Sequence, residues 1–195
     1  MAVILKCKLE RQVEIKSDGD VFHELFRYKP HHISTISPAN IHGVDLHEGD
    51  WGNVGSIITW NYTHDGKKKS AKEILEAVDE ETKTVTFKVI EGDLTELYKD
   101  FKGTVHVDTK GESNLVTWTF EYEKLNDEVE DPNTLMDFTI NVTKDIETHH
   151  LKERERERER EREVIMWFVV ADIYTTSTGV SASNNEGGVS VKVSK

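Results

Sequence analysis

The chain has 195 residues, enough for one domain with a sizeable core, and it carries a formal net charge of −12. An acidic chain of this kind repels phosphate backbones, so nucleic acid is not an expected partner. Its apolar runs are far shorter than the roughly 20 residues of a membrane-spanning helix. The apolar run at its N-terminus is too short for a secretory signal, and its one cysteine, Cys7, cannot form an internal disulfide. These features predict a cytoplasmic protein without a membrane span.

Alternation of apolar and polar residues predicts strands through most of residues 1–152. An alternating segment over residues 3–9 comes first, a short helix follows, and alternating segments then recur as far as residue 125, separated by short turns. Many short amphipathic strands of this kind are typical of an antiparallel sheet with one apolar face. The strongest alternating sets are Ile58, Trp60 and Tyr62; Val85, Phe87 and Val89; Phe101, Val105 and Val107; and Val116, Trp118, Phe120 and Tyr122.

The segment AKEILEAVDEE, residues 71–81, is ambiguous. It is rich in good helix formers, and propensity alone predicts a helix. However, Ile74, Glu76 and Val78 also alternate, and the segments on both sides are predicted strands.

Two helices are predicted. The first has Ser17 or Asp18 as its N-cap and ends before Pro30. The second lies within residues 131–152, with Asp131 as a cap and Pro132 at its first position, and extends for about 19 residues. Its apolar stripe consists of Leu135, Phe138, Val142 and Ile146, with Thr139 completing it.

Residues 153–195 differ from the rest of the chain. They begin with the low-complexity run ERERERERERE, which favours a solvated, fraying helix, because like charges repeat at i,i+4 and only the i,i+3 pairs are opposite. Alternating GAG and AGA codons would encode this run, so we hypothesise a translated repeat followed by read-through sequence. Residues 164–174 are apolar and able to dock or aggregate, and residues 175–195 have the composition of a disordered tail.

A single helix about 10–12 Å across cannot cover the inner face of a sheet of six or seven strands. Unless the sheet curls tightly, the uncovered space forms a cavity, and an apolar lining with a few hydroxyls suits an apolar or aromatic small molecule. The alternative is a fully packed core. The predicted ligand-binding residues are Phe26, Ile58, Trp60, Tyr62, Val85, Phe87, Val89, Phe101, Val105, Val116, Trp118, Phe120, Tyr122, Phe138 and Val142.

Three segments together resemble a known family. These are LHEGDWGNVGSIITWNYTHDGK, KEILEAVDEETKTVTFKVIEGDL and LVTWTFEYEKL, in this order along the chain. They are similar to the plant major latex proteins, which belong to the superfamily of birch-pollen allergens and class-ten intracellular pathogenesis-related proteins. The resemblance extends from about residue 2 to residue 152, where such proteins usually end.

The resemblance implies an α+β helix-grip fold. In this fold a seven-stranded curved antiparallel sheet surrounds a long C-terminal helix, two short helices form a V beneath it, and a hydrophobic cavity lies inside. Residues 71–81 would then be a strand. The implied activity is reversible binding of steroids, flavonoids or hormone-like molecules in defence and stress responses, by a monomer. Residues 1–152 would form this ligand-binding domain, with residues 153–195 disordered or artefactual.

The segment EGDWGNVGS, residues 48–56, contains Gly49, Gly52 and Gly55. A glycine-rich loop at this place in related proteins resembles a phosphate loop, but this one lacks the Gly-Lys-Ser/Thr ending and the following helix. Glu48 and Asp50 would also repel phosphate. We therefore expect a rigid hairpin whose glycines take positive φ, with Trp51 packed nearby.

Other functions have weaker support in the sequence. Nine histidines occur without HExxH or CxxC motifs, so neither a metal nor another cofactor is expected. An alkaloid-condensing enzyme needs a buried acid–base pair, and although Tyr62 and Glu73 could face inward, no lysine clearly accompanies them. A ribonuclease-like enzyme and a ligand-gated, protein-binding regulator remain alternatives, although the gate motifs of the superfamily's hormone receptors are absent. The preferred interpretation is a non-enzymatic carrier or sensor whose ligand and protein partner are unspecified.

Overall fold

The computed structural model describes residues 6–110, 113–178, 181–185 and 188–192. Residues 3–5 of the first expected strand lie outside this set. The chain divides into two compact units, Met1–Leu151 and Lys152–Lys195, and each is described by itself below.

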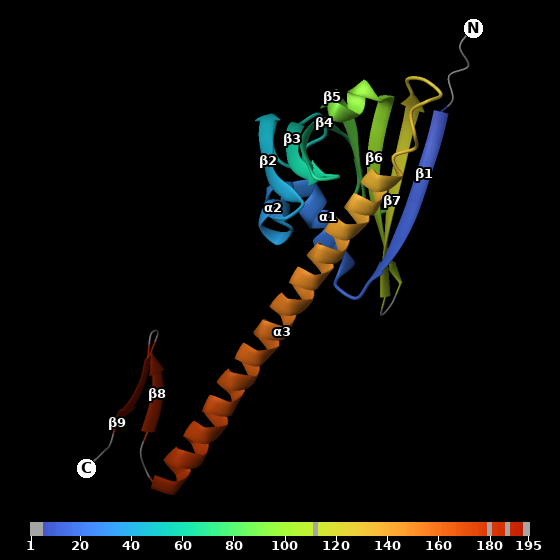
Figure 1. Cartoon of the computed structure of the whole chain (residues 1–195). Coiled ribbons are helices and arrows are strands. Elements are labelled where there is room, and N and C mark those ends of the chain that lie inside the picture. The colour runs from blue at the N-terminus through green and yellow to red at the C-terminus, as the bar shows by residue number, and fades with distance from the viewer. Residues whose placement is uncertain (1–5, 111–112, 179–180, 186–187, 193–195) are drawn as a thin grey trace. The chain divides into compact units, whose positions relative to one another are not determined.

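In the first unit, seven strands form one antiparallel sheet in the order β1-β7-β6-β5-β4-β3-β2 (Figure 1). The first strand, β1, pairs with the last strand of this sheet, β7, and lies at its edge. The strands are β1 (Lys6–Ile15), β2 (Ile41–Glu48), β3 (Ile57–His64), β4 (Lys67–Asp79), β5 (Thr84–Gly92), β6 (Tyr98–Lys110) and β7 (Ser113–Lys124).

The ambiguous segment is a strand, which confirms the expectation drawn from the family resemblance. It forms most of β4, which pairs with β3 through Trp60 and Ala71 and with β5 through Leu75 and Phe87. Its helix propensity is overridden because both neighbouring segments are strands that need a hydrogen-bonding partner. The pairing register between β4 and β5 shifts between Leu75 and Ala77, which marks a β-bulge.

Short helices lie at one end of the sheet (Figure 1). Helix α1 (Gly19–Tyr28) is capped by Asp18, whose carboxylate accepts a hydrogen bond of 3.0 Å from the backbone N–H of Asp20. The 3₁₀ turn η1 (Pro30–His32) leads into α2 (Ile33–Ile36), which packs next to β2, and a second 3₁₀ turn, η2 (Asp93–Glu96), joins β5 to β6. Together with the sheet and the long helix α3 (Asn133–Thr178), they form the expected helix-grip fold.

Helix α3 is longer than the expected 19 residues. Glu and Arg are good helix formers, so the helix continues through the Glu/Arg run, where Arg156 donates a 2.7 Å hydrogen bond to Glu153 one turn earlier. The start also differs from expectation, because the Asp131 side chain does not cap the helix. Its Oδ1 instead accepts hydrogen bonds from the Tyr122 hydroxyl, at 2.6 Å, and from Lys124 Nζ, at 2.8 Å.

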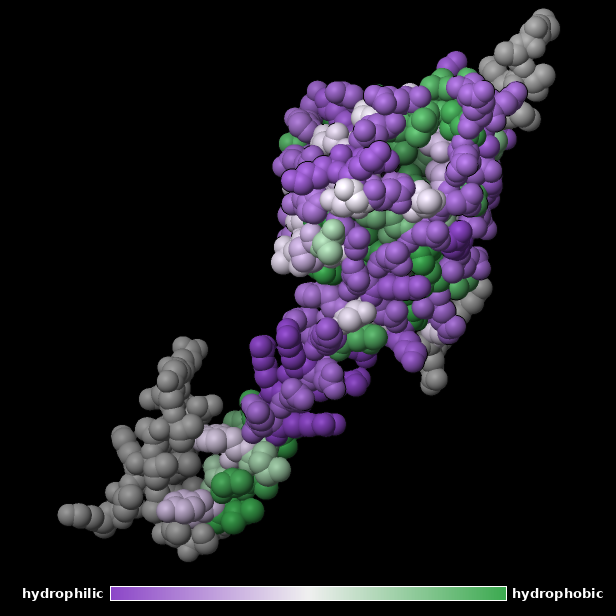
Figure 2. All heavy atoms as spheres, viewed as in Figure 1, coloured by the Kyte–Doolittle hydropathy of each residue, from purple (hydrophilic) through white to green (hydrophobic). Residues whose placement is uncertain are grey.

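The second unit contains helical residues 152–178 and a hairpin of β8 (Ser181–Asn185) and β9 (Gly188–Lys192). Disorder is expected over residues 175–195, and part of this range, residues 179–180, 186–187 and 193–195, lies outside the described residues. Apolar side chains between Val164 and Tyr174 are exposed, and Figure 2 shows them as an apolar stretch of the helix. None of the helices in the described part of the chain combines the length and apolar character needed to cross a membrane.

Candidate functional site

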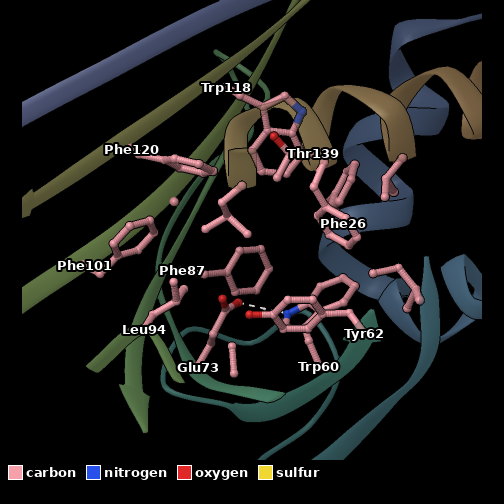
Figure 3. Close-up of a pocket in the computed structure, with 16 residues that line it drawn as sticks. Phe26, Trp60, Tyr62, Glu73, Phe87, Leu94, Phe101, Trp118, Phe120 and Thr139 are labelled. Carbon is pink, nitrogen blue, oxygen red and sulfur yellow. Dashed lines mark hydrogen bonds between the residues drawn. The ribbon is translucent and has the colours of Figure 1, made fainter. Parts of the chain in front are cut away.

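A cavity lies between the sheet and the first turns of α3, and Figure 3 shows side chains arranged around its open centre. The centre of a water molecule can occupy about 100 Å³ of this space. The cavity itself is larger, because a water molecule extends beyond its centre by its own radius. For a spherical space the cavity volume would be roughly 300 Å³, the lower end of the range for small-molecule sites. The interior is therefore not completely filled by the protein's own side chains.

Nine of the fifteen predicted ligand-binding residues line this cavity: Phe26, Trp60, Tyr62, Phe87, Phe101, Trp118, Phe120, Phe138 and Val142. The other six do not line it and lie in the packed core: Ile58, Val85, Val89, Val105, Val116 and Tyr122. Tyr122 has an additional constraint, because its hydroxyl donates to Asp131. Alternation identified the buried face of β3, β5, β6 and β7, but not that of β4, and it did not show which part of this face borders the cavity.

Seven further residues complete the lining: Ile41, Ala71, Glu73, Leu94, Gly103, Leu135 and Thr139. Leu135 and Thr139 belong to the apolar stripe of the long helix, so the sequence contained a signal for them. Gly103 is paired with Phe87 on one side and Phe120 on the other, and its missing side chain leaves space between two aromatic rings. No pattern in the sequence indicates that Ile41, Leu94 or Gly103 would border a cavity.

Among the described residues of the lining, Glu73 is the only one with an ionisable carboxyl or amino group. Figure 3 shows its carboxylate at the cavity wall, where Oε2 accepts a 2.9 Å hydrogen bond from Trp60 Nε1. The surface that the Glu73 side chain still exposes faces the cavity, so the side chain is only partly buried by area. Its carboxyl is nevertheless desolvated. This desolvation raises the pKa of Glu73 from its ordinary value of 4.5 to about 7, and the hydrogen bond from Trp60 opposes the rise.

Tyr62 lies on the same side of the cavity as Glu73 (Figure 3). Burial raises the pKa of the Tyr62 hydroxyl, and the negative charges of Glu73 and Asp93 raise it further. The hydroxyl therefore keeps its proton and is able to donate a hydrogen bond. Its ring packs against Phe138 of α3, with 5.4 Å between the ring centroids.

Trp118 forms the opposite wall and is held in place by α3. Its Nε1 donates a 2.9 Å hydrogen bond to the Thr143 hydroxyl, which in turn donates to the backbone carbonyl of Thr139 at 2.8 Å. The ring of Phe26 from α1 meets the Trp118 ring edge-on, with 5.1 Å between centroids. This wall is fixed by packing and hydrogen bonds, so the cavity has a defined shape.

The glycine loop joins β2 to β3 and does not line the cavity. Gly49, Gly52 and Gly55 have φ of +78°, +83° and +93°, a region that favours glycine. A Cβ on Gly52 would lie 2.3 Å from the Tyr28 ring, and Arg27 Nε donates to the Gly52 carbonyl at 3.3 Å. These contacts fasten the loop to α1.

The described residues contain no group of three or more His, Cys, Asp or Glu side chains able to hold a metal ion.

Residues 4–153 match the model of the pathogenesis-related protein Bet v 1 family. The chain belongs to this family. It is 54% identical over 147 residues to MLP-like protein 34 of Arabidopsis thaliana, covering 74% of this chain and 46% of that protein. It is 50% identical over 148 residues to MLP-like protein 43 of the same plant, covering 75% of this chain and 94% of that protein. The chain thus spans about half the length of the first relative and nearly all of the second.

Solved structures of the Bet v 1 family share the architecture. The crystal structure of ginseng major latex-like protein 151 from Panax ginseng has a TM-score of 0.74 and 60% sequence identity, covering 75% of this chain and 99% of that chain. These matches confirm the resemblance to major latex proteins. Norcoclaurine synthase from Thalictrum flavum, at 18% identity and a TM-score of 0.63, shares the fold alone.

Proposed function

We propose that this chain is a carrier or sensor that binds one small hydrophobic molecule in the cavity between the sheet and α3. The observation that carries the proposal is the lining itself, which is aromatic or aliphatic except for Glu73, the Tyr62 hydroxyl and Thr139. Steroids, flavonoids and hormone-like molecules combine fused or linked rings with a few polar groups, and such a lining suits them.

The proposal includes the setting of this binding. Residues 1–152 are the ligand-binding domain, and residues 153–195 take no part in it. The protein acts in the cytoplasm as a monomer, without nucleic acid, in defence or stress responses. Its role is to bind and release the small molecule and not to convert it chemically.

A displacement assay on the full chain tests this function. A neutral, environment-sensitive dye is expected to bind at about one site and to be displaced by a flavonoid or a steroid. The same flavonoid or steroid should raise the melting temperature of the protein. Dye that stays in water, together with an unchanged melting temperature, would contradict the proposal. Because the exposed apolar residues 164–174 offer the dye a second surface, the control is the double variant Ile165→Lys and Phe168→Glu. It should keep the displaceable signal.

One observation favours an enzyme as the second candidate. Glu73, with a pKa of about 7, lies beside Tyr62 in an apolar cavity, and such a carboxyl is suited to general acid–base catalysis near neutral pH. However, no lysine within the described part of the chain lines the cavity. Incubation with an aromatic amine and an aldehyde, followed by chromatography, tests this candidate, and we expect no condensation product beyond the buffer control. Product that depends on Glu73 would favour the enzyme instead.

A further inference from the structure

The cavity wall contains a group that a purely apolar ligand does not require. We propose that the cavity selects, among small aromatic molecules, those that carry a protonated amine, and that Glu73 binds the amine. This inference rests on the proposed function and specifies the class of ligand.

The position of Glu73 contrasts with that of its charged neighbours on β4. Lys72 pairs with Glu91 at 3.6 Å and Glu76 pairs with Lys102 at 2.6 Å, both on the outside of the sheet. Glu73 points to the cavity instead and has no cationic partner among the residues that line it. A carboxylate removed from water without a counter-charge is costly, so the site is electrostatically incomplete until a cation enters.

The hydrogen bonding of Glu73 is also incomplete. Within the described part of the chain, the Trp60 Nε1–H is the only donor to its carboxylate, and it occupies Oε2. Oε1 remains available to a group inside the cavity. A protonated amine supplies both the donor and the positive charge, and a charge-assisted hydrogen bond of this type is stronger than a neutral one.

The rest of the wall is suited to the same ligand. Aromatic rings surround the space that faces Glu73, and their faces attract a cation as well as an aromatic ring system. The rings come from five elements: Phe26, Phe87, Phe101, Trp118, Phe120 and Phe138. An aromatic compartment with a single acid at its wall fits an aromatic amine better than a carboxylate or a phosphate, which Glu73 would repel.

Among the described residues that line the cavity, none besides Glu73 carries a carboxyl or amino group. His64 of β3, whose ring lies 5.8 Å from that of Phe138, and Lys69 of β4, 3.4 Å from His64, are not part of the lining. The side chains that α1, β2, β5, η2, β6, β7 and α3 contribute to the lining are apolar or, in the case of Thr139, carry a hydroxyl. β3 adds Tyr62, which stays protonated, and Asp93 of η2 accepts a 3.0 Å hydrogen bond from the backbone N–H of Ser70. The protonation of Glu73 therefore responds mainly to what occupies the cavity.

Amine binding should displace a proton from Glu73. With its pKa at about 7, Glu73 in the empty cavity is mostly protonated one pH unit below that value. A bound ammonium stabilises the carboxylate, so the proton leaves to the buffer as the complex forms. An uncharged ligand has no such effect, which makes proton release a specific signature of the inference.

Isothermal titration calorimetry of the full chain tests the inference with three probes of equal size. They are 2-(aminomethyl)naphthalene, 2-(hydroxymethyl)naphthalene and 2-ethylnaphthalene. At about pH 8.5 the amine should bind about tenfold more tightly than the hydrocarbon. At about pH 6, titrations in two buffers of different ionisation enthalpy should show release of close to one proton for the amine and none for the alcohol.

Glu73→Gln keeps the size of the side chain and removes its charge. It should abolish both the tenfold preference for the amine and the proton release. Glu76→Gln changes the net charge of the chain equally, outside the cavity, and should leave both unchanged, which excludes a general attraction of amines to the acidic surface.

Two failures are distinguishable. If the hydrocarbon and the alcohol bind and the amine binds no more tightly than they do, this inference is overturned and the proposed function stays intact. The same holds if the amine binds more tightly but keeps this advantage in Glu73→Gln. If none of the three probes binds, both the inference and the proposed function are wrong. The proton count on the unmodified chain is an independent readout that does not require the variant to fold.

Discussion

Two stretches of the same helix have different surroundings. Residues 143–150 of α3 are fastened to the segments around α1 and α2, whereas residues 135–142 border the cavity. In the fastened stretch, Asp145 accepts hydrogen bonds from Ser37, at 2.5 Å, and Asn40, at 3.1 Å, and Glu147 accepts one of 2.7 Å from the backbone N–H of Lys16. Over the cavity, Leu135, Phe138 and Val142 face the open space.

This contrast between the two stretches bears on the origin of the free volume in the interior. The stretch that borders the cavity is the more apolar of the two, with Leu135, Met136, Phe138, Ile140 and Val142, whereas residues 143–150 contain a single aliphatic residue, Ile146. An apolar helix face therefore does not by itself produce a filled interior. None of residues 143–150 lines the cavity, and Thr143 and Ile146 are 0% exposed. His149 and His150 line a separate hollow together with residues of α1 and α2. Beside residues 135–142, the curved sheet and the single helix enclose a gap that the aromatic and aliphatic side chains of the lining do not fill.

Truncating one buried side chain in each stretch should change stability the most and should do so unequally. Ile146→Ala should lower the free energy of unfolding by about 4 kcal/mol, because a fully packed side chain leaves a new cavity. Leu135→Ala removes the same number of carbon atoms but should cost only about 2 kcal/mol, because Leu135 already borders open space and loses fewer contacts. Urea unfolding followed by circular dichroism measures both changes, and equal losses would contradict the comparison.

The next effect depends on pH and concerns the wall opposite residues 135–142. Because the pKa of Glu73 rises from 4.5 to about 7 on folding, its contribution to stability is fully present below about pH 4.5 and is lost as the pH rises through 7. Glu73→Gln removes this dependence. The variant should match the unmodified chain near pH 4.5 and be more stable by up to about 3 kcal/mol near pH 8.

Urea unfolding at the two pH values measures this difference. Glu76→Gln, on the outer face of the same strand, is the control and should show no comparable gain at high pH. A stability difference for Glu73→Gln that is independent of pH would show that the carboxyl is not desolvated by the cavity.

The smallest expected effect comes from enlarging a side chain in each stretch. Phe138→Trp should fill part of the cavity, weaken dye binding and change the free energy of unfolding by less than about 1 kcal/mol. Ile146→Phe forces extra atoms into a filled region and should cost about 1–3 kcal/mol while dye binding changes little. Unfolding and dye titration of the two variants provide the measurement. A similar loss of stability in both would indicate a filled interior throughout.

Much of the fold could be predicted from the sequence, but local competition limited the detail. Alternation gave the inner faces of β3, β5 and β7, whereas β4 was ambiguous until the family resemblance was considered, because Glu, Ala and Leu favour helices. The bulge after Leu75 also disturbs its alternation, so the regular spacing of Ile74, Glu76 and Val78 does not mark the face that borders the cavity.

The site was harder to predict than the fold for a geometric reason. Alternation distinguishes inside from outside, but the boundary between packed core and cavity depends on where α1 and α2 lie, which no local pattern contains. Val85 and Val116 therefore had the same signal as Phe87 and Trp118, yet only the latter two line the cavity. Glu73 could have been placed there by its register, because it pairs with the inward-facing Ile58 across β3.

Whether the interior contains an open cavity can be determined from a crystal of the full chain under xenon pressure, since xenon enters apolar cavities that side chains leave open. Our account predicts xenon between the rings of Phe87, Trp118 and Phe138, beneath residues 135–142 and not beneath residues 143–150. A structure without xenon at that place, in which side chains of the sheet and of α3 touch across the interior, would contradict it.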